Sequence, residues 1–186
     1  MKQVIEVNET NERKIDELGR IVIPKEIRRT LRIREGDPLE IYTDREGQIV
    51  LKKYSMMGDL GEFAKQYADA LSQTTGHIVA IADRDIVIAA SGGAKKDLLQ
   101  KPVSKELEQA IDDRQSLIAS GGEKNYRTIA NEEEHFSCEA ISPIICEGDA
   151  IGAVVLLSKE GKAEFGETEK KLTATAASFL GKQLEQ

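Results

Sequence analysis

The sequence has no tryptophan, and it has four phenylalanines and four tyrosines among its 186 residues. Its hydrophobic core must therefore be built from aliphatic side chains. Cysteine is also scarce, because Cys138 and Cys146 are the only two. Two cysteines cannot supply the framework of a small disulfide-stabilised protein, so a reducing compartment such as the cytoplasm is expected.

Hydrophobic runs are short as well. The longest, residues 150–157, is interrupted by Gly152 and is far shorter than the roughly 20 residues that span a bilayer. Residues 1–17 are polar and acidic, which does not match the basic and then apolar pattern of a signal peptide. These features predict a soluble cytoplasmic protein without a membrane partner.

The net charge of −7 is unevenly distributed along the chain. Residues 13–34 contain eight basic and three acidic side chains, a net charge of +5, whereas residues 54–186 contain 14 basic and 22 acidic side chains, a net charge of −8. Because salt screens exposed charges beyond about 10 Å, an acidic chain can still bind phosphates through a local basic block.

Residues 1–54 form a first block of short elements. The pattern predicts a strand at 20–23 that stops at Pro24, a helix at 25–31, and strands at 39–42 and 48–51. Such a block has about ten core aliphatic residues, which is marginal for an independent monomer, so dimerisation is expected.

Residues 55–186 read as a second, α+β domain with a central antiparallel sheet between long terminal helices. The expected helices cover 60–76, 104–119 and 167–184, and the expected strands cover 78–81, 86–89, 126–129, 136–145 and 150–157. The two terminal helices either pack on the sheet or join a helical bundle between subunits.

Residues 14–31 (KIDELGRIVIPKEIRRTL), continued by 36–41 and 49–54, resemble the signature of the AbrB-type swapped-hairpin family. The resemblance implies an intertwined, dimeric β-barrel made by swapped hairpins of two chains. It also implies double-stranded DNA as the partner, contacted through arginines that fall here on Arg13, Arg20, Arg28 and Arg29. Beside them, the charge of Lys14 extends the electrostatic reach, so Lys14 is counted with the expected DNA-binding residues.

The chemistry of arginine agrees with that role. Its planar guanidinium can hold a phosphate or a guanine edge with two hydrogen bonds. The alternative is a solvated basic face paired with the nearby Glu17, Glu26 and Glu35. Residues 9–12, where the family has an apolar strand, are polar here, so the first strand is expected at Val4–Val7, and the position of Arg13 depends on this shift.

The remainder of the chain resembles a GAF-like α/β sandwich. This resemblance implies a sensory or oligomerisation domain, and the turns at Ser91–Gly93 and Gly121–Gly122 are places where a pocket for an unidentified small-molecule effector could open. The pairing of the two domains is typical of regulators of gene expression in the forespore of endospore-forming bacteria.

The sequence has few features that point to a catalytic or metal site. His77, His135, Cys138 and Cys146 lack the spacing of a metal site, and the cysteines lie in apolar strands, where they are expected to be buried. Asp112–Asp113 and Glu132–Glu134 are hydrophilic runs typical of solvated surface. We therefore expect no enzyme activity, no metal and no cofactor.

The features together predict a DNA-binding transcriptional regulator that is a swapped dimer and, if its terminal helices also pair between subunits, a tetramer. One alternative is the antitoxin of a toxin–antitoxin pair, which uses related swapped hairpins. Another is a GAF-fold enzyme such as a sulfoxide reductase, which needs a reactive thiol with a resolving partner.

Overall fold

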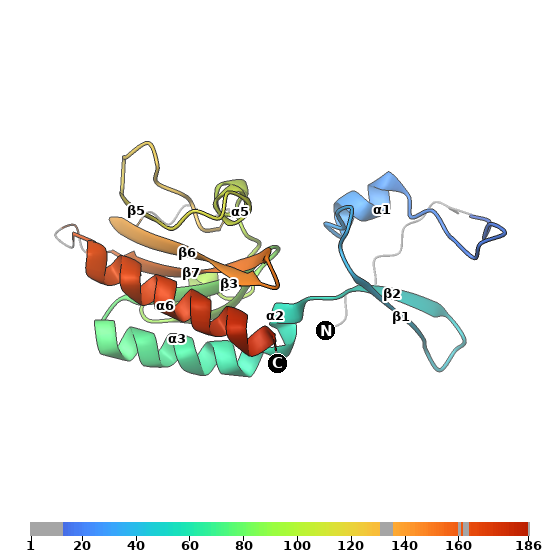
Figure 1. Ribbon diagram of the computed structural model, residues 1–186, viewed down its shortest axis with the longest axis horizontal. Coiled ribbons are helices and arrows are strands. Elements are labelled where there is room, and N and C mark those ends of the chain that lie inside the picture. Colours follow the sequence, from blue (N-terminus) through green and yellow to red (C-terminus); the bar gives the residue numbers. More distant parts are fainter. Residues whose placement is uncertain (1–12, 131–135, 160, 162–163, 186) are drawn as a thin grey trace. The chain divides into compact units, whose positions relative to one another are not determined.

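The computed structural model describes residues 13–130, 136–159, 161 and 164–185. The chain divides into two compact units, Met1–Tyr54 and Ser55–Gln186, which are described separately below (Figure 1). The expected strand at Val4–Val7, the Glu132–Glu134 run and His135 lie outside the described residues.

The N-terminal unit contains helix α1 (Lys25–Thr30) and the antiparallel hairpin of β1 (Leu39–Thr43) and β2 (Ile49–Lys53). Pro24 precedes α1, where its fixed φ suits a helix start and its missing N–H costs nothing. The hairpin turn is held by Asp44, whose carboxylate accepts hydrogen bonds from the N–H groups of Glu46 and Gln48. The helix and both hairpin strands were predicted within two residues of these bounds.

The strand predicted at residues 20–23 was wrong for the single chain. β1 and β2 pair with each other, and no described segment forms a ladder with residues 20–23. A strand needs a partner for its backbone N–H and C=O groups. Ile21 and Val22 are consequently 51% and 73% exposed.

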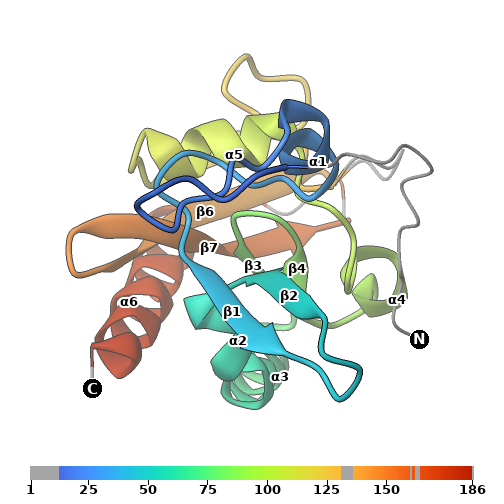
Figure 2. The same cartoon turned by 90° about the vertical axis from the view of Figure 1, so that its right-hand side faces the viewer.

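The C-terminal unit is built on one five-stranded antiparallel sheet with the order β4-β3-β7-β6-β5. Four of these strands, β3, β4, β6 and β7, are labelled in Figure 2. Its strands are β3 (Ile78–Asp83), β4 (Val87–Ser91), β5 (Leu117–Ser120), β6 (Cys138–Cys146) and β7 (Asp149–Ser158). Its helices are α2 (Met56–Asp59), α3 (Gly61–Thr75), α4 (Lys95–Leu98), α5 (Lys105–Asp112) and α6 (Glu167–Leu184). None of the described helices is long and apolar enough to cross a membrane.

Helices α3 and α6 lie side by side on one face of this sheet (Figure 1). Each buries small and aliphatic side chains against the strands, including Ala68 of α3 and Leu180 of α6. On their outer side, the ring of Phe179 lies 5.7 Å from Phe63 and 5.6 Å from Tyr67, centroid to centroid. Of the two alternatives for the terminal helices, packing on the sheet is therefore the one seen within the chain.

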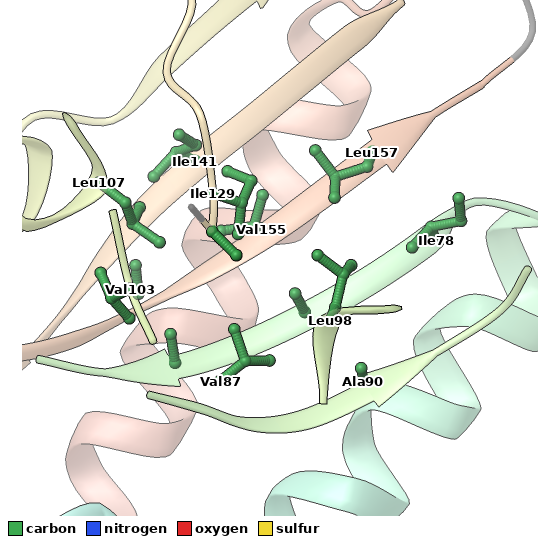
Figure 3. Close-up of a cluster of buried hydrophobic side chains, with 14 of the residues drawn as sticks. Ile78, Val87, Ala90, Leu98, Val103, Leu107, Ile129, Ile141, Val155 and Leu157 are labelled. Atoms are coloured by element: carbon green, nitrogen blue, oxygen red, sulfur yellow. The ribbon is translucent and has the colours of Figure 1, made fainter. Parts of the chain in front are cut away.

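The other face of the sheet is covered by α4, α5 and the connecting segments. Figure 3 shows the aliphatic core of this layer, to which strands, helices and the 126–130 segment all contribute side chains. The expected cap of α5 is confirmed, because the Ser104 hydroxyl accepts a hydrogen bond from the Leu107 N–H.

Two predicted elements in this layer were wrong. The helix from residue 104 ends at Asp112 and not near 119, because the chain turns at Arg114, with φ +55°, and Leu117–Ser120 pairs with β6. Residues 126–129 are not a strand. They cover the core as a loop, held by hydrogen bonds from the backbone N–H and hydroxyl of Ser104 to the carbonyls of Ile129 and Thr128.

Candidate nucleic-acid interface

The described part of the N-terminal unit, residues 13–54, has no interior of its own. None of residues 13–54 is buried, and eight of the ten large hydrophobic side chains that are exposed among the described residues belong to this unit. They are Ile15, Leu18, Ile21, Val22, Leu31, Ile41, Tyr42 and Ile49. So much exposed apolar surface on so small a unit is typical of a surface that is covered by another protein chain.

Arg20 is held by a tight turn. The Asp16 carboxylate accepts hydrogen bonds from the backbone N–H groups of Leu18 and Arg20, and Asp16 Oδ2 lies 2.7 Å from Arg20 Nε. The hydrogen bond from the Arg20 backbone, followed by that from its side chain, lowers the pKa of Asp16. The Arg20 side chain remains 72% exposed, so the turn orients it without covering it.

Arg28 and Arg29 occupy the last turn of α1 and are both exposed. Positive charge is favourable there because the carbonyl end of a helix carries partial negative charge. Arg13 and Lys14 are exposed as well, at the start of the described chain. All five predicted DNA-binding residues thus lie on the 13–20 segment or on α1 of the same unit.

A network around Lys53 was not predicted. The Lys53 ammonium lies 2.9 Å from Asp37 Oδ2 and donates to the Arg32 carbonyl at 2.9 Å, while Asp37 also accepts from the Arg34 N–H at 2.8 Å. The register of the hairpin could have indicated this network, because it places Lys53 opposite Leu39, two residues after Asp37.

In the C-terminal unit, the two glycine-containing turns do not come together. Gly92–Gly93 follow β4 and Gly121–Gly122 follow β5, and these are the two edge strands of the sheet. A side chain at Gly92 would press on the Ile78 backbone, and Gly92 has φ +90°, so packing and turn geometry account for this glycine.

Among the described residues of this unit, Glu139 carries the most deeply buried carboxyl, ahead of Asp83. It lies opposite Leu157 in the β6–β7 ladder and is 0% exposed. One of its oxygens accepts a hydrogen bond from the Arg127 N–H, and the other has no hydrogen-bond partner among the residues that the structure describes. Burial raises the pKa of Glu139 to about 8, against smaller opposing effects of that hydrogen bond and of the Arg127 charge.

The sequence-based expectation for the cysteines is confirmed, since Cys138 and Cys146 are both buried. Burial raises the pKa of the Cys146 thiol, which disfavours the reactive thiolate. No group of three or more potential metal ligands is found in the part of the chain that the structure describes.

Comparison with known proteins places the chain in a family. A family model described as "Stage V sporulation protein T C-terminal, transcription factor" matches residues 59–185. Stage V sporulation protein T of Bacillus subtilis (strain 168) is 53% identical over 174 residues, which cover 94% of this chain and 96% of that protein. The chain belongs to the stage V sporulation protein T family.

Other comparisons identify the two domains of this family member. A model described as "Antidote-toxin recognition MazE, bacterial antitoxin" matches residues 12–59. Transition state regulatory protein AbrB of B. subtilis (strain 168) is 69% identical over 42 residues, 23% of this chain and 43% of AbrB. The N-terminal domain is therefore AbrB-like.

The C-terminal domain has the GAF fold. The GAF domain of Acinetobacter phosphoenolpyruvate-protein phosphotransferase matches with a TM-score of 0.54 and 11% identity, over 72% of this chain and 84% of that chain. Because the relationship to stage V sporulation protein T extends over nearly the whole chain, the protein is a transcriptional regulator of the sporulation class and not an antitoxin.

Proposed function

We propose that residues 1–54 bind double-stranded DNA as a swapped dimer and that residues 55–186 join dimers and receive a signal. Arg13, Lys14, Arg20, Arg28 and Arg29 are the proposed DNA contacts. One observation carries this proposal. Within residues 13–54, the proposed basic contacts and the large apolar side chains are exposed on the same unit. The apolar set suits a second copy of the chain, and the basic set suits phosphates and base edges.

The second copy would double the basic set on the DNA-binding surface. Two sets of arginines related by a twofold axis can contact two successive half-sites of a duplex. Because arginines contact phosphates as readily as bases, we expect recognition to depend on DNA shape as well as on base contacts.

The proposed role of the C-terminal domain is twofold. The exposed side of α3 and α6, which carries Phe179 at 40% exposure, is the proposed contact that assembles dimers into a tetramer. The GAF fold supports a small-molecule effector, and the family supports action in the cytoplasm of the forespore. We propose no catalytic role for this domain.

The decisive variant is Arg28→Ala/Arg29→Ala, assayed for affinity to duplex DNA by fluorescence anisotropy. We expect a loss of at least about tenfold, because four positive charges leave the surface of a dimer. The control Lys105→Ala/Lys182→Ala removes the same charge from exposed positions of the C-terminal unit, and its affinity should stay within about twofold of wild type. Wild-type affinity of the Arg28→Ala/Arg29→Ala variant contradicts the proposal.

A further inference from the structure

The segment between α1 and β1 is held at both of its ends. At the end near the helix, the Ile33 N–H donates to the Arg28 carbonyl at 2.7 Å. At the other end, the Lys53 ammonium binds the Asp37 carboxylate, and the Arg34 N–H donates to that same carboxylate. The last residue of the hairpin is therefore tied to the segment that follows the arginines of α1.

The Lys53–Asp37 pair is shielded from water more than the Arg20–Asp16 and Lys52–Glu40 pairs of the same unit. The side chains of Lys53 and Asp37 are 19% and 16% exposed. For the neighbouring pair of Lys52 and Glu40, the nitrogen–oxygen distance is 3.7 Å and the exposures are 66% and 46%. A shielded pair with additional hydrogen bonds fixes geometry, whereas an exposed pair contributes little.

The backbone beside this pair has little freedom to relax. Arg32 has φ +51°, in the left-handed region that non-glycine residues rarely adopt, and its carbonyl accepts a hydrogen bond from the Lys53 ammonium. Such a conformation persists when surrounding contacts hold it. Removal of the ammonium would take a hydrogen bond from the Arg32 carbonyl and the ion pair from the Asp37 carboxylate, which would keep its hydrogen bond from the Arg34 N–H.

We propose that Lys53 and Asp37 are positioning residues that set the orientation of α1, and thereby of Arg28 and Arg29, on the DNA-binding surface. The inference rests on the DNA binding proposed above for these arginines. Neither residue needs to touch DNA for this role, because both act through the 32–37 segment.

Charge alone predicts a different result. If electrostatic attraction were all that mattered, Asp37→Asn would strengthen DNA binding, since it removes a negative charge from a surface that binds phosphates. A positioning role predicts the reverse sign. The same variant thus separates the two explanations.

The experiment measures the affinity of the full-length protein for one duplex by fluorescence anisotropy at fixed salt. The test variants are Asp37→Asn, Lys53→Met and the two combined. The matched controls are Glu40→Gln and Lys52→Met, which make nearly the same charge changes in the exposed neighbouring pair. Lys53→Arg, which keeps the charge, serves as the conservative variant.

We expect Asp37→Asn and Lys53→Met each to lower the affinity about tenfold, and the combined variant to lose no more than either alone. Lys53→Arg should keep most of the DNA affinity that Lys53→Met loses. Glu40→Gln should bind as well as wild type or slightly better, and Lys52→Met should lose less than about threefold. Amide exchange should quicken at Ile33 and Arg34 while the β1 and β2 amides keep their protection.

Three results overturn the proposal. If Asp37→Asn binds DNA as well as wild type or better, Asp37 affects DNA affinity through its charge and not by positioning α1. If only Lys53→Met loses DNA affinity, Lys53 is a phosphate contact. If amide-exchange protection falls throughout β1 and β2, Lys53 and Asp37 stabilise the whole hairpin and do not specifically position α1. Arg28→Ala/Arg29→Ala is measured alongside, so that failure of the proposed function is recognised separately.

Discussion

Glu139 differs from Asp16 and Asp37, because its surroundings oppose its ionisation. Hydrogen bonds lower the pKa of Asp16. At Asp37, burial alone would raise the pKa, but the hydrogen bonds and positive charges of Arg34 and Lys53 together lower it. Burial raises the pKa of Glu139, and one of its oxygens lacks a hydrogen-bond partner within the described part of the chain. The folded C-terminal domain therefore favours the protonated form of this carboxyl.

This shift predicts a pH-dependent stability that Glu139→Gln removes. The pKa of Glu139 is about 8 in the folded protein and 4.5 when unperturbed. Its protonation therefore contributes fully to the free energy of unfolding below pH 4.5, and this contribution is lost as the pH rises toward 8. Between pH 5 and pH 8, we expect wild type to lose on the order of 3 kcal/mol relative to the Gln variant. Urea unfolding followed by circular dichroism measures the difference.

The control for this measurement is Glu106→Gln, at an exposed position of α5. It should change the stability by less than about 0.5 kcal/mol at either pH. A stability difference between wild type and Glu139→Gln that is the same at pH 5 and pH 8 contradicts the assignment of a raised pKa to Glu139.

At the scale of elements, the long helices and the sheet strands were predictable because their signals are local. Helix α3 ends at Thr75 and is followed by Gly76, whose φ of +73° suits the position after a helix, and Ser104 caps α5 as expected. The end of α5 was not predictable in this way. Residues 117–120 belong to a strand because β6 lies beside them, which is a tertiary contact that periodicity does not record.

Helix α6 depends on one close approach to the sheet. A Cβ atom at Gly181 would fall inside van der Waals contact with the carbonyl of Ile145 on β6. Since the neighbour is backbone, it cannot move aside as a side chain would. Gly181 therefore sets how closely α6 can pack on the sheet.

We predict that Gly181→Ala destabilises the C-terminal domain by at least about 1 kcal/mol, even though alanine favours a helix by a similar amount. The comparison is Ser178→Ala at an exposed position of the same helix, which should be neutral or slightly stabilising. Thermal unfolding of both variants measures this, and a Gly181→Ala protein as stable as wild type contradicts the close approach.

At the scale of the whole molecule, the two-domain organisation and the basic block could be predicted, but the contacts that hold the arginines could not. The AbrB-type resemblance pointed to Arg20, Arg28 and Arg29. The Asp16 turn and the Lys53–Asp37 pair depend on distances between side chains, for which the sequence has no local pattern. The lack of a ladder at residues 20–23 among the described residues fits the proposed swapped dimer, in which this strand would pair with a second chain that one chain's sequence cannot show.

The central claim is that two chains are needed to make the DNA-binding unit. Sedimentation equilibrium of the full-length protein, free and bound to duplex DNA, tests it most directly. The chain has a mass of 20.5 kDa, so we predict protein masses at twice or four times that value, about 41 or 82 kDa, in both states. A 20.5 kDa monomer that binds the duplex as a single folded chain would contradict the account.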